Sequence, residues 1–220
     1  MCGRWATPFS KEHIEAHYKI SVPVFTPSYN IVPGSDVLVV TQDKSKKTEI
    51  MKWGLVPFWA KDPKIGYKLI NARAESLQQK PSFKKPFVSR RCLIPAGGFY
   101  EWKKTAQGKL PYYIHMRTRH IFSFAGLFDV WTDAQGKKIK TFTIITTNAN
   151  PLVLPIHDRM PVILEKKHED EWLMSNNMKR LTGLLKPYEL EKNMEVYPVN
   201  PRVNNPATNT KENIKPYKYA

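Results

Sequence analysis

The sequence predicts one α+β domain spanning residues 1–220, in which a strongly twisted antiparallel sheet or barrel-like core is flanked by short helices. Three observations lead to this fold class. The 220 residues are 41% hydrophobic, which is enough for one sizeable core. Strand-like segments follow one another without an intervening helix from residue 90 to residue 147. Short helical patterns precede and follow this run, and no repeat or linker divides the chain.

The first ninety residues alternate between helical and extended patterns. Ser10 is a suitable N-cap for the segment SKEHIEAHYKI, and a polar turn, DKSKK, separates two apolar runs. The expected elements are a helix at 10–20, an extended stretch with Pro23, Pro27 and Pro33, strands at 36–42 and 48–57, and a helix at 71–80.

The remaining residues read first as strands and then as helices. Gly108 and Gly136 mark turns between strands. The expected elements are strands at 90–104, 109–118, 120–131 and 137–147, helices at 169–175 and 178–186, a strand at 195–199, and a polar tail from Asn200 whose last residues we expect to be mobile.

The charge balance favours a polyanionic partner. Lys and Arg number 35 against 19 Asp and Glu, so the net charge is +16. Phosphate contacts to such a surface release counterions, which favours nucleic acid. The alternative is a lysine-rich surface that serves solubility alone.

Cysteine usage and hydropathy indicate a cytoplasmic protein. Two cysteines are too few for a disulfide framework. The opening CGRWATPFSKEH lacks the apolar stretch of a signal peptide, and no run approaches the roughly 18 apolar residues of a membrane span. We therefore expect no membrane association.

Two histidines have metal-ligand spacing but lack the rest of a metal motif. His13 and His17 are four residues apart, yet Ile14 replaces the glutamate that a zincin requires, and no Pro-Cys-x-x-Cys follows. No glycine-rich phosphate loop occurs either. We expect no metal and no cofactor.

Cys2 lies directly behind the initiator methionine and before Gly3, so removal of Met1 is permitted. The product would carry a free α-amine, with a reference pKa of about 7.7–8.0, beside a thiol of about 8.5. Such a 1,2-aminothiol condenses with an aldehyde, first through the amine as a Schiff base and then through the thiol as a five-membered thiazolidine.

Three further stretches contain residues suited to acid–base or anion chemistry. Glu101 in GGFYEW has an apolar context that would raise its pKa, unless an arginine pairs with it. His157 in PIHDRMP suits proton shuttling, or else lies in an ordinary surface turn. Asn71 and Arg73 in NARAES could hold an amine and a phosphate, or could simply cap a helix.

Five motifs in order, MCGR, WGLVP, NARAES, GGFYEW and IHDRMP, resemble the SOS response-associated peptidase (SRAP) family from Met1 to about Pro216. The resemblance implies a protein that crosslinks covalently to abasic sites in single-stranded DNA, including sites at single-strand/double-strand junctions. It also implies autoproteolytic loss of a residue ahead of Cys2. Phe58 stands where a family member has a second tryptophan, which leaves the stacking there open.

The resemblance also implies roles for individual residues. Cys2 would be the nucleophile, Asn71 would hold its terminus, Glu101 would move protons during ring opening and Schiff-base formation, and His157 would assist. The implied DNA-binding residues are Arg4, Asn30, Pro33, Trp59, Arg73, Trp102, Thr146 and Arg159. We expect a monomer that is cytoplasmic and associates with the nucleoid when engaged.

Two other functions fit some of these features. A conventional cysteine peptidase acting on external polypeptides would need the thiol but no free amine. A non-catalytic module that binds single-stranded DNA would need only the charge and the aromatic residues. Neither predicts a DNA adduct that survives denaturation.

Overall fold

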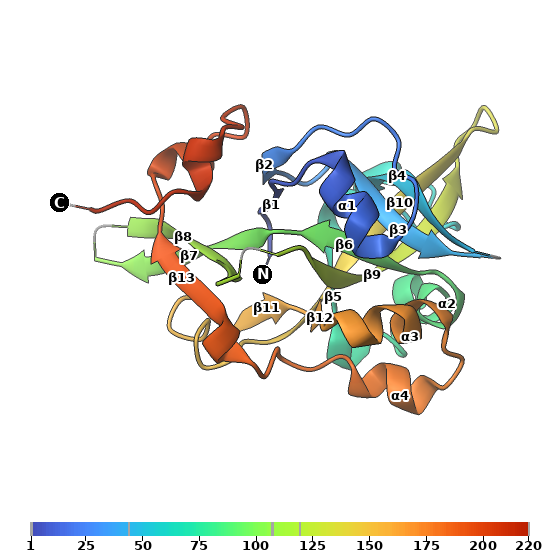
Figure 1. Cartoon of the computed structure of the whole chain (residues 1–220). Helices are drawn as coiled ribbons and strands as arrows, with labels where there is room; N and C mark the ends of the chain where they lie inside the picture. Colours follow the sequence, from blue (N-terminus) through green and yellow to red (C-terminus); the bar gives the residue numbers. More distant parts are fainter. Residues whose placement is uncertain (1, 44, 107, 119, 220) are drawn as a thin grey trace.

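A closed five-stranded barrel is the centre of the larger of the two sheets. The computed structural model describes residues 2–43, 45–106, 108–118 and 120–219. The barrel strands are β3 (Asp36–Gln42), β4 (Lys46–Trp53), β6 (Arg91–Ala96), β9 (Phe122–Thr132) and β10 (Lys138–Asn148). They pair in the order β10-β4-β3-β6-β9, and β9 pairs with β10 again to close the ring. Figure 1 labels these strands, and of their five pairings only β4–β10 is parallel.

Alternate residues of these strands point into the barrel and out of it, which explains why the strands read as continuous apolar runs. On β3, Val37 and Val39 belong to the inner cluster, together with Trp5, Trp53 and other buried residues. Leu38 and Val40 belong to a separate outer cluster. The sequence therefore encodes two apolar layers, one inside the barrel and one beneath the helices.

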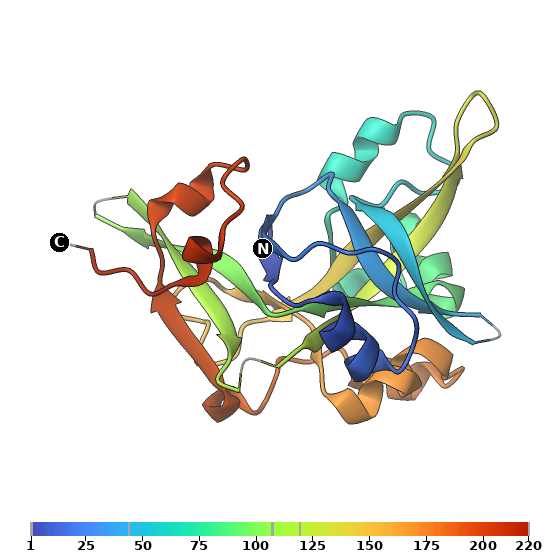
Figure 2. The ribbon, with the colours of Figure 1, turned by 45° about the horizontal axis from the view of Figure 1, so that its top comes forward.

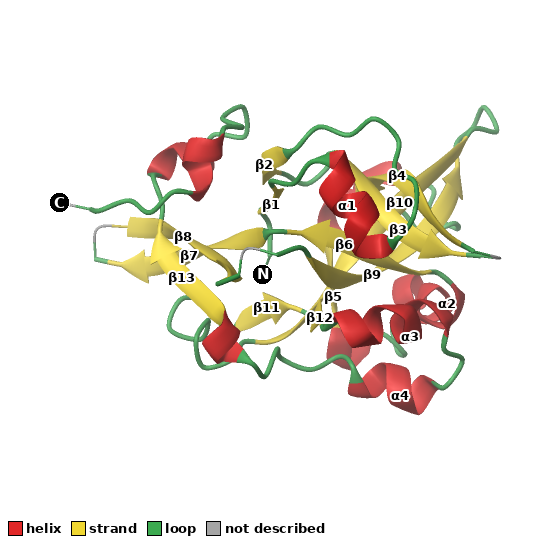
Figure 3. Cartoon of the chain, in the orientation of Figure 1, coloured by secondary structure: helices red, strands yellow, loops and turns green. Residues whose placement is uncertain are grey.

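Four short helices cover the outer face of the barrel (Figure 3). Ile14, Phe83, Trp172 and Leu181, one from each helix, are buried in the outer cluster. The helices are α1 (Lys11–Tyr18), α2 (Pro81–Ser89), α3 (Glu169–Met174) and α4 (Met178–Gly183), and the short strands β5 (Asn71–Arg73), β11 (Arg159–Pro161) and β12 (Ile163–Leu164) extend the barrel sheet.

A second, fully antiparallel sheet stands beside the barrel. Its strands, in spatial order, are β13 (Met194–Pro198), β8 (Gly108–Met116), β7 (Gly98–Thr105), β1 (Trp5–Thr7) and β2 (Ser28–Ile31). Figure 2 shows the C-terminal segment, in red, beside this sheet. There the backbone N–H of Tyr217 donates to the Pro198 carbonyl at 2.9 Å.

The chain passes from the barrel to the second sheet at a pair of glycines. β6 ends at Ala96, and β7 begins at Gly98. A Cβ on Gly97 would lie 2.5 Å from Pro8 Cδ, and a Cβ on Gly98 would lie 2.3 Å from Tyr113 Cζ. The GG of GGFYEW is therefore required by close packing on both sides of the crossing.

The predicted fold class is confirmed, but the predicted helix at 71–80 is wrong. Residues Asn71–Arg73 form β5, which pairs in parallel with Ile144–Thr146 of β10, and a 3₁₀ turn (η2, Ala74–Ser76) follows. Pairing with the buried residues Ile144–Thr146 of β10 outweighs the helical propensity of Ala, Arg and Glu. The helix begins only at Pro81, and its Phe83 and Phe87 are buried.

None of the helices in the described part of the chain is long and apolar enough to span a bilayer.

A buried carboxylate joins α1 to α3. Glu169 is 2% exposed and accepts hydrogen bonds from Ser123 Oγ and Lys166 Nζ, each at 2.6 Å. His17 Nε2, from α1, lies 2.9 Å from Oε1 of the same Glu169 carboxylate. Burial alone would raise the pKa of Glu169, but these hydrogen bonds hold it below the ordinary value.

The lowered pKa of Glu169 makes stability depend on pH. Its contribution is complete above the ordinary Glu pKa of about 4.3 and declines as pH falls through the lower folded-state pKa. We expect Glu169→Gln to cost roughly 2–4 kcal/mol at pH 7 and less at pH 3, in urea unfolding at both pH values. Glu165→Gln, in a more exposed pair with Lys167, should cost less than about 1 kcal/mol. An equal cost of Glu169→Gln at both pH values would contradict this account.

Candidate active site

β1 brings the N-terminal residues to the middle of the molecule (Figure 1). Trp5 lies opposite Phe99 in the antiparallel β1–β7 pair, and the Tyr100 N–H donates to the Arg4 carbonyl at 2.9 Å. Continued by two residues, this register places Gly3 opposite Glu101. The pairing therefore sets Cys2 beside a carboxylate that is ninety-nine residues away in the sequence.

Asn71 fixes the backbone of Cys2. Its Nδ2 donates to the Cys2 carbonyl oxygen at 2.8 Å. Asn71 is the first residue of β5, opposite Ile144 of β10, so the sheet sets its position. The Oδ1 atom of the same side chain is buried and has no hydrogen-bond partner among the described residues. This oxygen is a preformed acceptor next to Cys2.

Glu101 is a buried carboxyl group in an apolar strand. It is 3% exposed, and burial raises its pKa above the ordinary value; neighbouring positive charge, including that of His157, partly offsets this effect. A carboxyl group with a raised pKa can both donate and accept a proton near neutral pH.

The Cys2 thiol is fully buried. Burial raises its pKa, and the negative charge of Glu101 raises it further. The thiol is therefore protonated at neutral pH, and Glu101 is close enough to influence it. Cys92 is also buried and also has a raised pKa, but its side chain belongs to the barrel interior against Gly126.

His157 lies in the loop before β11 and is partly exposed. Its Nδ1 lies 2.9 Å from both the Arg159 backbone nitrogen and Asp158 Oδ1. The Arg159 N–H requires an unprotonated Nδ1, whereas the carboxylate favours a protonated one. Asp158 is 81% exposed, so the backbone N–H of Arg159 is the more sheltered of these two partners.

Three predicted phosphate or active-site residues lie on, or two positions from, one cross-strand row of the barrel sheet. Thr146 lies opposite Arg73 of β5 and Pro161 of β11, and Arg159 follows two positions away opposite Asn148. Arg73 is exposed, whereas the Arg159 side chain is 10% exposed. Thr146 Oγ1 is buried without a hydrogen-bond partner in the described part of the chain.

Arg159 is held by a carboxylate that the sequence analysis did not single out. Its two terminal nitrogens lie 2.8 and 3.0 Å from the two carboxylate oxygens of Glu75, and further bonds reach Asn148 Oδ1 and the Thr146 carbonyl. The hydrogen bond from Arg159 lowers the pKa of Glu75. Glu75 lies within NARAES itself, two residues after Arg73, which is the only sequence signal for it.

Another predicted set lies at the tail. Arg4 donates to Asn30 Oδ1 at 2.8 Å and lies 5.9 Å from the Trp102 ring centre. Asn30 Nδ2 donates to the carbonyls of Val203, Asn205 and Thr208. Asn30 is 5% exposed and so anchors the C-terminal segment; a role in separating bases stays a prediction.

The remaining predicted residues lie outside these contact-linked groups in the part of the chain that the structure describes. Trp59 follows β4 and is 48% exposed beside Phe58, which is 50% exposed. Lys85 Nζ lies 4.7 Å from the Phe58 ring centre. Pro33 is in the turn between β2 and β3. Trp59 and Phe58 therefore offer ring surface to solvent, where a base could stack.

The two metal-spaced histidines have separate partners. His13 Nδ1 lies 2.9 Å from Ser10 Oγ, and His17 contacts Glu169. No group of three or more His, Cys, Asp or Glu side chains in the described ranges is arranged to hold a metal ion.

The sequence was compared with known protein families and with curated relatives. The family described as SOS response associated peptidase (SRAP) matches residues 1–206. The chain belongs to the SRAP family. Among SRAP relatives, the abasic site processing protein YoqW of Bacillus subtilis is 45% identical and covers 98% of this chain and 99% of its own. The abasic site processing protein HMCES of Gallus gallus is 34% identical and covers 87% of this chain and 67% of its own.

Solved structures agree with the SRAP assignment. A crystal structure of a protein from Bacteroides thetaiotaomicron matches with a TM-score of 0.90 and 28% identity, over 99% of this chain and 100% of the other. A phage-related protein from Bordetella bronchiseptica matches with a TM-score of 0.70 and 29% identity, over 90% and 94%.

The two arginines of the sheet row should respond differently to substitution. If Arg73 contacts a phosphate, Arg73→Ala should flatten the slope of log affinity against log salt by about 0.7 for single-stranded DNA. Glu75→Gln removes the charge that holds Arg159, so it should steepen the slope by up to about 0.7 if Arg159 faces DNA. Glu165→Gln is a matched control on another element. If Glu75→Gln instead weakens binding without a change of slope, Glu75 serves only to position Arg159.

Proposed function

We propose that this SRAP chain traps abasic sites in single-stranded DNA as a covalent adduct on Cys2, which becomes the N-terminal residue once Met1 is removed. The observation that carries this proposal is the grip of Asn71 on the Cys2 carbonyl beside a buried Glu101 with a raised pKa. The relatives named abasic site processing proteins support it. The adduct would shield the site from strand breakage, because the ring resists elimination.

The reaction begins with the amine. An abasic sugar is a closed hemiacetal in equilibrium with an aldehyde, and opening it moves a proton to the ring oxygen. Glu101, whose pKa is raised by burial, is the proposed donor of that proton, and its carboxylate then takes up the proton that the C1′ hydroxyl releases. The Cys2 amine then adds to the aldehyde carbon, and loss of one water gives a Schiff base. Asn71 Oδ1 is available to accept a hydrogen bond from the amine and aim its lone pair at that carbon.

Ring closure follows with the thiol. The Cys2 sulfur adds to the Schiff-base carbon, its proton passes to the nitrogen through Glu101, and a thiazolidine forms. The net change is one aldehyde plus one aminothiol giving a ring and one water. A protonated thiol suits this second step because closure is intramolecular and needs no free thiolate in advance. His157, which is electrostatically coupled to Glu101, assists proton movement in closure and reversal.

DNA binding would use charge and exposed rings. The net charge of +16 attracts the phosphates, and Arg73, Arg4 and Arg159 are the proposed contacts. Trp59 and Trp102 are the proposed stacking surfaces, with Pro33 at the bend between separated bases. The protein would act as a monomer on single strands and at single-strand/double-strand junctions, in the cytoplasm and at the nucleoid.

Peptidase activity would be limited to loss of the residue ahead of Cys2. An external cysteine peptidase would need the thiol but no free amine. The general peptidase alternative therefore predicts activity in a chain that keeps Met1, whereas the amine-first reaction predicts none.

A denaturing gel tests the proposal. The protein is mixed with a single strand containing one abasic site, with the undamaged strand, and with a strand whose abasic analogue lacks the hydroxyl at C1′. A retarded band is expected only with the true abasic site, because only that sugar opens to an aldehyde. Equal retardation with all three strands would refute aldehyde capture, and retardation with none would leave the non-catalytic binding module as the function.

A further inference from the structure

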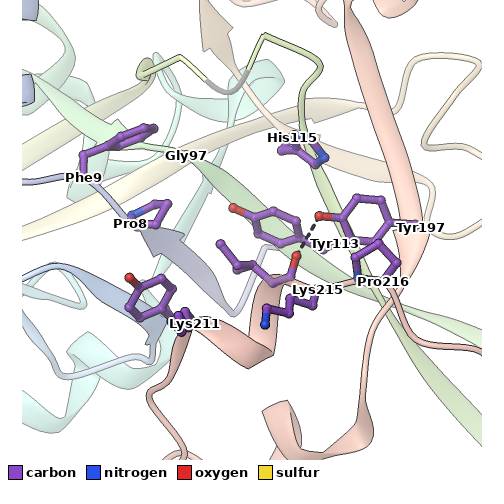
Figure 4. A pocket seen from close by; sticks show the side chains of 11 residues that line it. Pro8, Phe9, Gly97, Tyr113, His115, Tyr197, Lys211, Lys215 and Pro216 are labelled. Atoms are coloured by element: carbon purple, nitrogen blue, oxygen red, sulfur yellow. Dashed lines mark hydrogen bonds between the residues drawn. The ribbon is translucent and has the colours of Figure 1, made fainter.

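A cavity of about 340 Å³ lies on the second sheet beneath the C-terminal segment (Figure 4). Its lining includes Pro8, Phe9, Tyr113, His115 and Tyr197. Figure 4 shows Pro8 and Phe9 on one side, with Tyr113, His115 and Tyr197 on the other. This size falls in the range of about 300–1,000 Å³ that small-molecule sites occupy.

The cavity is separate from the Cys2 site. Tyr113 lies opposite Tyr100 in the β7–β8 pair, whereas Glu101 lies opposite Tyr112. Successive residues of a strand point to opposite faces, so the Tyr113 ring and the Glu101 carboxyl are on opposite faces of the second sheet. A ligand in this cavity would not touch the proposed acid–base group.

The aromatic wall of the cavity is ordered before any ligand binds. The Tyr113 and His115 rings are stacked, with centroids 5.4 Å apart and planes at 24°. The Tyr197 ring meets His115 edge-on at 5.3 Å, and its hydroxyl donates to the Ile214 carbonyl at 2.7 Å. Gly98 leaves the space that the Tyr113 ring occupies. A planar ring could therefore enter without the cost of ordering these side chains.

Positive charge lies at the mouth of the same cavity. Lys211 and Lys215 line it, both exposed, on and just after the 3₁₀ turn η6 (Lys211–Ile214). Lys215 is paired with Glu212 at 2.8 Å, and Lys211 has no ion pair among the described residues. The mouth thus has one lysine in excess over its carboxylate.

We propose that this cavity binds a nucleotide, with the base against the partly exposed rings of Phe9 and Tyr197, over the buried Tyr113 and His115, and the phosphate at Lys211 and Lys215. Aromatic rings stack on any base, and ammonium groups attract phosphate. The nucleotide is either free or one unit of a bound single strand. This inference does not depend on the reaction at Cys2.

Calorimetric titration with deoxyadenosine monophosphate at low salt tests the proposal, and oligonucleotides of increasing length distinguish the two sources. Ile214→Trp fills the cavity without a change of charge, and Lys211→Glu with Lys215→Glu reverses the charge at its mouth. Each should weaken binding by about tenfold, equivalent to one lost stacking or charge contact. Lys137→Glu with Lys138→Glu, on the exposed β9–β10 hairpin, is the matched control for charge. Thermal unfolding verifies that every variant folds.

Three results of these titrations distinguish a free-nucleotide site, a site for one unit of a bound strand, and no nucleotide site. Weaker mononucleotide binding in both cavity variants, but not in the control, supports a free-nucleotide site. Weaker oligonucleotide binding alone, with no mononucleotide affinity, supports a site for one unit of the bound strand. Unchanged affinity for both ligands in folded cavity variants overturns the proposal. Crosslinking to a short abasic strand, measured alongside, should persist in Ile214→Trp; its absence even from the unmodified protein would refute the proposed function without affecting this one.

Discussion

Cys2→Ala is expected to abolish the stable DNA adduct while leaving a reversible one. Alanine keeps the α-amine, and its small side chain still permits removal of Met1. The Schiff base should therefore form and be trapped by borohydride, but no sulfur is present to close the ring. On denaturing gels, adduct without borohydride should fall to background, a loss of more than about a hundredfold on the scale of other nucleophile deletions.

Cys2→Ser should behave in the same way, since a hydroxyl is the weaker nucleophile. Cys92→Ala is the control, because Cys92 faces the barrel interior and has no α-amine of its own to form a Schiff base. If Cys92→Ala removed the adduct and Cys2→Ala did not, the nucleophile would be misassigned.

Glu101→Gln should slow crosslinking by about 10²–10⁴-fold, the usual contribution of a general acid–base. Glutamine keeps the shape of the side chain and removes its titration. Binding of undamaged single strands should stay near the unmodified value, because Glu101 is buried and the proposed phosphate contacts are elsewhere. The measurement is a time course of adduct formation from pH 5 to pH 9. His157→Ala should slow the reaction less, since water can partly replace a proton shuttle.

Glu101→Gln should also stabilise the fold at neutral pH. A carboxyl whose folded-state pKa is raised binds its proton more tightly in the folded protein, so the penalty appears as pH rises through the ordinary Glu pKa to the higher folded value. Above that range glutamine avoids the penalty, and the melting temperature of the variant should exceed that of the unmodified protein. An unmodified crosslinking rate with a lower melting temperature would show that Glu101 is structural.

The strands were predictable because their apolar runs and glycine turns are local signals. The closure of five of them into a barrel was only partly predictable, because a ring depends on which edges meet. The parallel β4–β10 pairing joins residues about ninety apart and leaves no local trace. A second parallel pairing, of β5 with β10, converts the first half of NARAES from the predicted helix to a strand and so carries Asn71 to Cys2.

The candidate site, like the fold, was predictable only where its residues carry a local sequence signal. Cys2, Asn71, Glu101 and His157 were proposed from motifs. Two long-range pairings then position them: β5–β10 sets Asn71 at Cys2, and the β1–β7 register, continued to Gly3, sets Cys2 near Glu101. Glu75 was missed because a carboxylate near an arginine in sequence does not reveal which arginine it binds; it holds Arg159, eighty-four residues away. The hydrogen bonds of the Asn30 amide to three tail carbonyls were not predicted, and its role at DNA stays a prediction.

Intact-mass spectrometry of the adduct tests the central claim most directly. The protein is incubated with an abasic single strand, denatured and weighed, and the crosslinked peptide is then sequenced. The aminothiol reaction predicts the mass of the chain without Met1 plus one oligonucleotide minus one water, with the DNA on the peptide that begins at Cys2. An adduct that still contains Met1, or one attached at any residue other than Cys2, would contradict it.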